Sequence, residues 1–139
     1  MEYKRFGNTI VVRMDPGEEI VEQVRNVSLK ENIQLASITA IGAINHLVAG
    51  VYSVPEQKYY KNEFNGVYEI TSLVGNISTM NGENYIHLHI TCGDEKGNCI
   101  GGHLNEARIS ATCEMFINVI DGTVDRVKDE KTGLNVFKF

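Results

Sequence analysis

Three of the four histidines fall in two short segments whose patterning is typical of neighbouring β-strands. His87 and His89 alternate with isoleucine and leucine, and His103 follows a pair of glycines. Side chains two residues apart on a strand project from the same face. His87 and His89 therefore share one face, and the aliphatic side chains between them point to the other face, toward a core.

A loop at residues 93–97 would fold the two segments into a hairpin, with His103 opposite His89. Cross-strand neighbours have Cβ atoms about 4.5–5.5 Å apart, so three imidazoles can meet at one point. Zinc binds imidazole nitrogen at about 2.0–2.1 Å, and catalytic zinc sites commonly use three protein ligands and a water. The spacing predicts a metal site at His87, His89 and His103, with zinc as the expected ion and nickel, copper or iron as alternatives. The competing interpretation is three polar histidines on a solvated strand face.

A pocket is predicted beside these histidines. Gly101 and Gly102 carry no side chain and would let another group approach the backbone closely. His46 is separate in sequence and is interpreted as a turn or pocket residue, not as a ligand. The predicted pocket is thus lined by Gly101, Gly102, His46 and Glu114. A water or a substrate oxygen would complete the metal shell, because the sequence offers no evident fourth ligand.

Two carboxylates are candidates for acid–base chemistry at this pocket. Glu114 lies inside an apolar strand pattern, where a carboxylate needs a partner such as Arg108 or a metal-bound water. Glu106 fits a solvated loop charge better. Cys92 and Cys99 flank the same loop as the histidines and are expected to be small buried hydrophobic side chains.

The elements that must position these residues are mostly short strands. The pattern predicts an α+β domain with a mainly antiparallel sheet and one main helix at residues 18–31, ending near Asn32, with Asp15 as a possible cap. Hairpin turns are expected at Asn65-Gly66, Asn81-Gly82 and Asp121-Gly122. Strands are predicted at residues 3–14 (two, around Gly7-Asn8), 35–44, 47–54, 59–64, 67–79, 84–92, 98–104, 109–120, 123–127 and 135–139.

Composition narrows the class of protein. A chain of 139 residues with 42% hydrophobic and 22% charged residues suits one globular domain, residues 1–139, and argues against intrinsic disorder. The net charge of −5 argues against direct binding to duplex DNA, because that affinity comes largely from basic side chains. A local basic patch around Arg108, Arg126 and Lys128 is the alternative that the net charge would hide.

Motifs and cysteines add further exclusions. Cys92, Cys99 and Cys113 form no close pair, which disfavours a disulfide framework and favours a reducing cytoplasm. There is no apolar run of membrane-spanning length and no secretory signal, so we expect a cytoplasmic protein without a membrane partner. Phosphate-loop, dinucleotide and serine-hydrolase motifs do not occur.

Five segments together resemble the PPC domain (plants and prokaryotes conserved), in the order of that family and over nearly the whole chain. They are Ile41-Gly42-Ala43-Ile44, Gly66-Val67-Tyr68-Glu69-Ile70, Leu73-Val74-Gly75-Asn76-Ile77-Ser78, His87-Leu88-His89 and Gly101-Gly102-His103-Leu104. The resemblance implies a strongly curved antiparallel sheet with a helix against it, and a homotrimer.

The resemblance also carries functional expectations. In plants the domain follows an AT-hook that binds AT-rich DNA; this chain has no Arg-Gly-Arg-Pro hook, and Val67 stands where the plant motif has arginine. The chain thus looks like the stand-alone prokaryotic form. The fold is also similar to acetolactate decarboxylase, whose comparable histidines hold zinc, which by analogy makes His87, His89 and His103 ligands.

Three functions are weighed on this basis. The first is a trimeric zinc-binding protein with a small-molecule site, which as an enzyme would be a zinc-dependent lyase or hydrolase. The second is a DNA-associated regulatory protein. The third is a protein-interaction scaffold in which the histidines only hold the trimer together.

Overall fold

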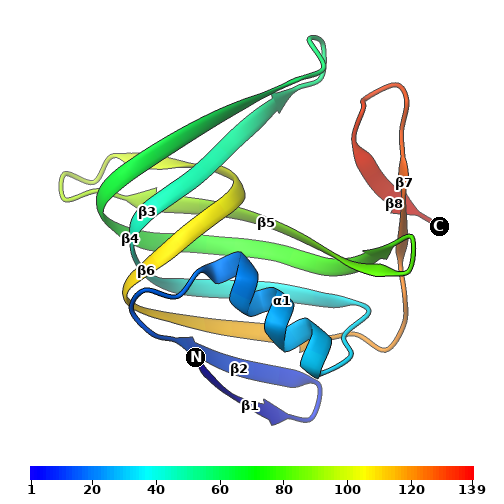
Figure 1. Cartoon of the computed structure of the whole chain (residues 1–139), viewed down its shortest axis with the longest axis horizontal. Helices are drawn as coiled ribbons and strands as arrows, with labels where there is room; N and C mark the ends of the chain where they lie inside the picture. Colours follow the sequence, from blue (N-terminus) through cyan, green and yellow to red (C-terminus); the bar gives the residue numbers. More distant parts are fainter.

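The computed structural model describes all 139 residues, which form eight strands and one helix (Figure 1). The predicted α+β class with one main helix is confirmed. The helix is neither long nor apolar enough to cross a membrane. The elements are β1 (Glu2–Phe6), β2 (Thr9–Met14), α1 (Ile20–Lys30), β3 (Ala36–Ser53), β4 (Lys58–Met80), β5 (Glu83–Gly93), β6 (Cys99–Val119), β7 (Asp125–Lys128) and β8 (Asn135–Lys138).

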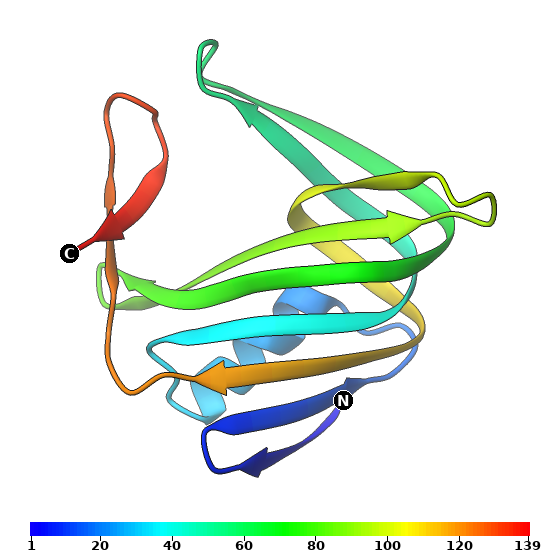
Figure 2. The ribbon, with the colours of Figure 1, turned by 180° about the vertical axis from the view of Figure 1, so that it is seen from behind.

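All the strands belong to one strongly curved sheet, seen from both sides in Figures 1 and 2. The strand order is β1-β2-β6-β3-β4-β7-β8, and β5 pairs with both β4 and β6. The pairings β3–β4, β4–β5, β5–β6 and β6–β3 are all antiparallel and return to their starting strand, so the sheet curls back on itself. One parallel bridge, between Thr79 and Asp125, joins β4 to β7.

The central strands are longer than the sequence pattern predicts. The expected strands 35–44 and 47–54 are one strand, β3, because the register shifts near Gly42 and His46 bend the chain without ending it. Such a bulge leaves a residue unpaired while the ladder continues. The expected strands 98–104 and 109–120 likewise form a single strand, β6.

Of the three expected hairpin turns, only the one at Asn81-Gly82 is confirmed. Both residues have positive φ, 54° and 81°, as a two-residue hairpin turn requires, and the turn joins β4 to β5. Asn65-Gly66 lies inside β4, opposite His46, and the β3–β4 hairpin closes instead at residues 54–57. Asp121-Gly122 does not return the chain along β6, because β7 pairs with β4 and β8.

The helix is slightly shorter than the predicted residues 18–31. Glu19 caps it, accepting hydrogen bonds from the backbone N–H groups of Val21 and Glu22, and Asn32 follows it with a φ of 51°. The buried face of α1 carries Ile20 and Val24, and the helix packs against β5 and β6. The helix therefore covers one face of the sheet, against the histidine-bearing strands β5 and β6 (Figure 1).

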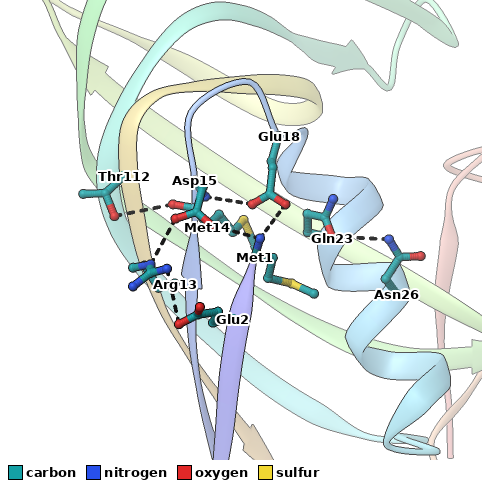
Figure 3. A network of polar contacts seen from close by, with 9 residues as sticks. All are labelled: Met1, Glu2, Arg13, Met14, Asp15, Glu18, Gln23, Asn26 and Thr112. Carbon is teal, nitrogen blue, oxygen red and sulfur yellow. Dashed lines mark hydrogen bonds and ion pairs between the residues drawn. The ribbon is translucent and has the colours of Figure 1, made fainter.

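A polar network holds the segment between β2 and α1 (Figure 3). The amino group of Met1 donates to Asp15 Oδ2 at 3.0 Å and to Glu18 Oε1 at 2.6 Å, and Arg13 Nε donates to Asp15 Oδ1 at 3.0 Å. Asp15 therefore pairs with two cations and does not cap the helix. This network ties the N-terminus of the chain to the segment that leads into α1.

Candidate metal centre

The three predicted imidazoles meet above the β5–β6 hairpin. His89 on β5 pairs directly with His103 on β6, as the loop position predicts. The ring centroids are 5.1 Å apart for His87–His89, 5.1 Å for His87–His103 and 5.6 Å for His89–His103. Their candidate ligand atoms all lie within 4.8 Å of one another. The predicted convergence is therefore confirmed as a geometric fact.

Local features of the hairpin fix this register. The Asp94 side chain accepts hydrogen bonds from the backbone N–H groups of Lys96 and Asn98, at 2.9 and 2.8 Å. Behind the histidines, Leu88 and Ile90 are buried, with exposed fractions of 1% and 3%. A one-residue slip of β5 would turn both aliphatic side chains to solvent and the histidines into the core, so burial selects the observed face.

Gly101 and Gly102 allow a close approach to the backbone, as predicted, but the approaching group is not a pocket ligand. A Cβ on Gly101 would lie 2.1 Å from the backbone oxygen of Ile90, and a Cβ on Gly102 would lie 2.6 Å from the backbone oxygen of Gly50. The group that approaches each glycine is thus a neighbouring strand of the protein. Gly102 still lines the cavity described below, and Gly101 does not.

The ring nitrogens have the spacing and the protonation state that metal ligands need. His87 Nε2 and His89 Nε2 face each other at 3.2 Å. Two ligands of a tetrahedral metal with bonds of 2.0–2.1 Å are about 3.4 Å apart. Burial, and then the nearby charges of His103, Arg126 and His89, lowers the pKa of His87 to about 4. Burial also lowers the pKa of His103. Both side chains are therefore neutral near pH 7, which is the form that binds a metal.

The donor set fits a metal ion with an open position. The cluster contains only the three histidines, with no fourth histidine, cysteine or carboxylate. Cys92 is buried within the core, where desolvation raises its pKa to about 12, so it remains a protonated thiol. Three imidazoles and no fourth side chain match the ligand count of open zinc sites and not that of closed structural sites.

The histidines open into a cavity of about 820 Å³ that three parts of the chain enclose. Its floor is the sheet, one side is the projecting β3–β4 hairpin, and another is the β7–β8 hairpin near the C-terminus (Figure 1). Tyr59, from the β3–β4 hairpin, packs against the histidine cluster, with its ring edge-on to that of His103 and the ring centroids 6.1 Å apart. Its hydroxyl donates to Asn105 Oδ1 at 2.6 Å, which holds the ring in place.

The other predicted pocket residues lie elsewhere. His46 sits at a bulge of β3, where its Nδ1 lies 2.8 Å from Asn65 Oδ1. Glu114 is exposed on the outer face of β6 and needs no buried partner. Arg108 donates instead to Glu106 Oε1 at 3.2 Å, outside the cavity. Neither carboxylate is among the residues that line the cavity.

The expected burial of the cysteines flanking the loop is half correct, because Cys92 is buried and Cys99 is exposed. Cys113 is also buried, and all three cysteines are unpaired.

Several residues that line the cavity were not predicted from the sequence. Tyr85 lies two residues before His87 on the same strand face, so period-two counting could have found it. Asn76 is opposite His87 on β4, a position that follows from the Asn81-Gly82 turn. Arg126 and Phe137 come from the β7–β8 hairpin, and no local signal places them at the cavity.

Comparison with known proteins identifies the family. The sequence profile of the Plants and Prokaryotes Conserved (PCC) domain, also written PPC, matches residues 1–121. The fold and the match over most of the sequence show that the chain belongs to this family. A comparison with curated proteins gave no match.

Solved structures similar to this chain are described in different functional terms. A Bacteroides thetaiotaomicron protein described as a suspected DNA-binding protein is 32% identical, with 99% of this chain and 96% of that chain covered and a TM-score of 0.96. A metal-containing protein from Archaeoglobus fulgidus is 33% identical, with coverages of 99% and 97% and a TM-score of 0.90. A PPC protein from Pyrococcus horikoshii is 28% identical, with coverages of 99% and 94% and a TM-score of 0.86.

The expected likeness to acetolactate decarboxylase is confirmed for the fold alone. The enzyme from Bacillus subtilis is 17% identical to this chain and has a TM-score of 0.58. The match covers 88% of this chain and 57% of the enzyme. A shared fold at this distance carries no activity across.

Proposed function

We propose that this protein binds a divalent metal ion, zinc in the first instance, through His87, His89 and His103, and presents it to a small molecule in the adjoining cavity. The observation that carries the proposal is the meeting of three imidazoles, with ligand atoms within 4.8 Å, at a cavity that contributes no acidic side chain. The metal-containing relative from Archaeoglobus fulgidus supports the same conclusion.

The chain's own residues would prepare the site for such an ion. A zinc ion held there with an open position would polarise a carbonyl or lower the pKa of a bound water, which is the chemistry of zinc-dependent lyases and hydrolases. His87 and His103 supply neutral nitrogens because burial lowers their pKa values. Leu88 and Ile90 anchor the strand in the core on its opposite face, and the Tyr59 ring packs edge-on against His103.

We propose a homotrimer as the working assembly. The outer face of the sheet carries an exposed apolar patch formed by Ile41, Val74 and Phe116, with exposed fractions of 58%, 48% and 47%. Thr39 on β3 pairs with both Val74 and Phe116, so these two side chains flank it in one row across three strands. Ile41 lies two residues further along β3. A contiguous exposed apolar patch on a small domain is typical of an interface.

A DNA-associated role is the second candidate, because the Bacteroides thetaiotaomicron relative is described in those terms. Two residues of the predicted basic patch, Arg126 and Arg108, argue against a DNA-associated role. Arg126 is 7% exposed and faces the cavity, and Arg108 is paired with Glu106. With a net charge of −5, any role at DNA would then depend on a partner that contacts the phosphates.

Metal analysis of tag-free protein tests the proposed function. We expect about one metal ion per chain in the wild type, little in His89→Ala, and the wild-type amount in Leu88→Ala. The Leu88 variant is the matched control, since it disturbs the same strand by removing buried apolar volume and keeps all three ligands. Equal metal content in the wild type and His89→Ala would refute the three-histidine site.

A further inference from the structure

Arg126 on β7 is a buried cation without an anionic partner. The residue is 7% exposed, and no carboxylate lies within 4.0 Å of its guanidinium. Its Nε donates to Ser78 Oγ at 2.8 Å, Nη1 to the backbone oxygen of Asn135 at 2.8 Å, and Nη2 to Asn76 Oδ1 at 2.9 Å. All three acceptors are neutral.

Two aromatic rings also contact the guanidinium. Its central carbon lies 4.5 Å from the centroid of Tyr85 and 4.3 Å from that of Phe137. Ring faces attract cations, and the three hydrogen bonds orient the group, so the side chain is held in a defined position. A guanidinium has five N–H groups, however, and two of those on Arg126 have no protein acceptor. Burying a charge in this state is costly unless an anion joins it.

The cavity supplies no such anion from the protein. Arg126 lines the same cavity as the three histidines, and none of its fifteen lining residues is an aspartate or a glutamate. Asn76 links the two ends of the site, because it accepts from Arg126 and lies opposite His87 on the neighbouring strand. The charge of Arg126 is close enough to contribute to the lowered pKa of His87. A divalent ion on the histidines would add two further positive charges.

The remaining cavity wall is apolar and aromatic. It consists of Val51, Tyr52, Tyr59, Leu134, Val136 and Phe137. A cavity of this size and lining, with a few polar groups at one end, is typical of small-molecule sites. Its ligand therefore needs one anionic end and a compact apolar body.

We propose that the cavity binds a small organic carboxylate, with its carboxylate on the two unpartnered N–H groups of Arg126 and its apolar body against the aromatic wall. The proposal rests on the proposed function in that both concern one site, with the metal at its histidine end. The β7–β8 hairpin supplies Arg126 and half of the apolar wall, and it lies beyond residues 1–121, the part that the family profile matches. The hairpin would therefore supply both the charge and much of the apolar surface that recognise the ligand.

Calorimetric titration with benzoate and with benzamide, its uncharged analogue of the same shape, tests this assignment. We expect the wild type to prefer benzoate by at least tenfold, with and without zinc, because Arg126 remains charged in both states. Arg126→Gln should lower benzoate affinity by roughly ten- to a hundredfold, the usual range for a lost charge-assisted hydrogen bond. Benzamide affinity and zinc content should stay within twofold of the wild type.

Two controls make the result decisive. Arg108→Gln removes an exposed arginine outside the cavity and should leave benzoate affinity unchanged. If Arg126→Gln does not fold, Arg126→Lys and the wild-type comparison decide, since the lysine keeps the charge but loses the fork of donors and should bind benzoate more weakly than the wild type.

The outcomes separate this proposal from the proposed function. Equal affinities for benzoate and benzamide in the wild type, no benzoate binding at millimolar concentration, or unchanged benzoate binding in a folded Arg126→Gln variant would each overturn the carboxylate assignment. A wild type that contains no metal but still prefers benzoate would overturn the metal site and leave the carboxylate assignment standing.

Discussion

Gly102→Ala tests whether the close approach of β3 to β6 positions His103. Gly102 has a φ of 149°, a conformation that side-chain-bearing residues rarely adopt, and a Cβ there would lie 2.6 Å from the backbone oxygen of Gly50. The unfavourable backbone conformation costs about 1–3 kcal/mol, and forcing extra volume into a packed site costs about the same again. We therefore expect the free energy of unfolding to fall by about 2–6 kcal/mol.

Gly97→Ala is the matched control in the same hairpin. Gly97 also has a positive φ, 81°, but a Cβ there would meet nothing within 4 Å. It should lose only the conformational cost of about 1–2 kcal/mol and keep its metal.

Urea unfolding of the metal-free variants, followed by far-ultraviolet circular dichroism, measures this difference. A zinc titration should also show weaker binding by Gly102→Ala, because β6 shifts at His103. Equal stability and equal zinc affinity of the two variants would refute the reasoning.

Three further predictions concern assembly, pH and nucleic acid. In sedimentation the wild type should behave as three chains of 15.5 kDa, and Phe116→Glu should behave as one, because a charge would then lie in the apolar patch; identical sedimentation of the two would count against this interface. The melting temperature of the metal-free protein should fall as the pH is lowered from about 6.5 to 4. The pKa values of His87 and His103 are lowered in the folded protein, so the unfolded chain binds more protons in this range. A His87→Gln variant should lose part of this dependence, and a melting temperature that is flat over this range would contradict it. Titration with an AT-rich duplex at physiological salt should show no binding by this chain alone; tight, strongly salt-dependent binding would reverse that expectation.

The histidine cluster was predictable because its geometry depends on local rules. Alternation along one strand orients His87 and His89, and the short loop after β5 sets the register that brings His103 opposite His89. The same counting from the Asn81-Gly82 turn would have placed Asn76 opposite His87. Residues joined by a tight turn thus carry their spatial relation in the sequence.

The long strands and the ligand end of the cavity were not predictable in this way. Gly42 and Asn65-Gly66 resemble chain breaks, yet each lies in a continuous strand that bends, because the pairing partners on both sides hold it. Arg126 reaches the cavity from a segment joined to β4 by a single bridge, so its position depends on tertiary packing of the C-terminal hairpin. His46 and Glu114 gave the opposite error, since residue type alone does not tell which face of a bent strand meets the cavity.

Anomalous diffraction at the zinc absorption edge, from crystals of tag-free protein grown with zinc, tests the central claim most directly. The account predicts one anomalous peak per chain, about 2.0–2.1 Å from a ring nitrogen of each of His87, His89 and His103, with no fourth side chain bound. A peak elsewhere on the chain, or no peak at the three histidines, would contradict it.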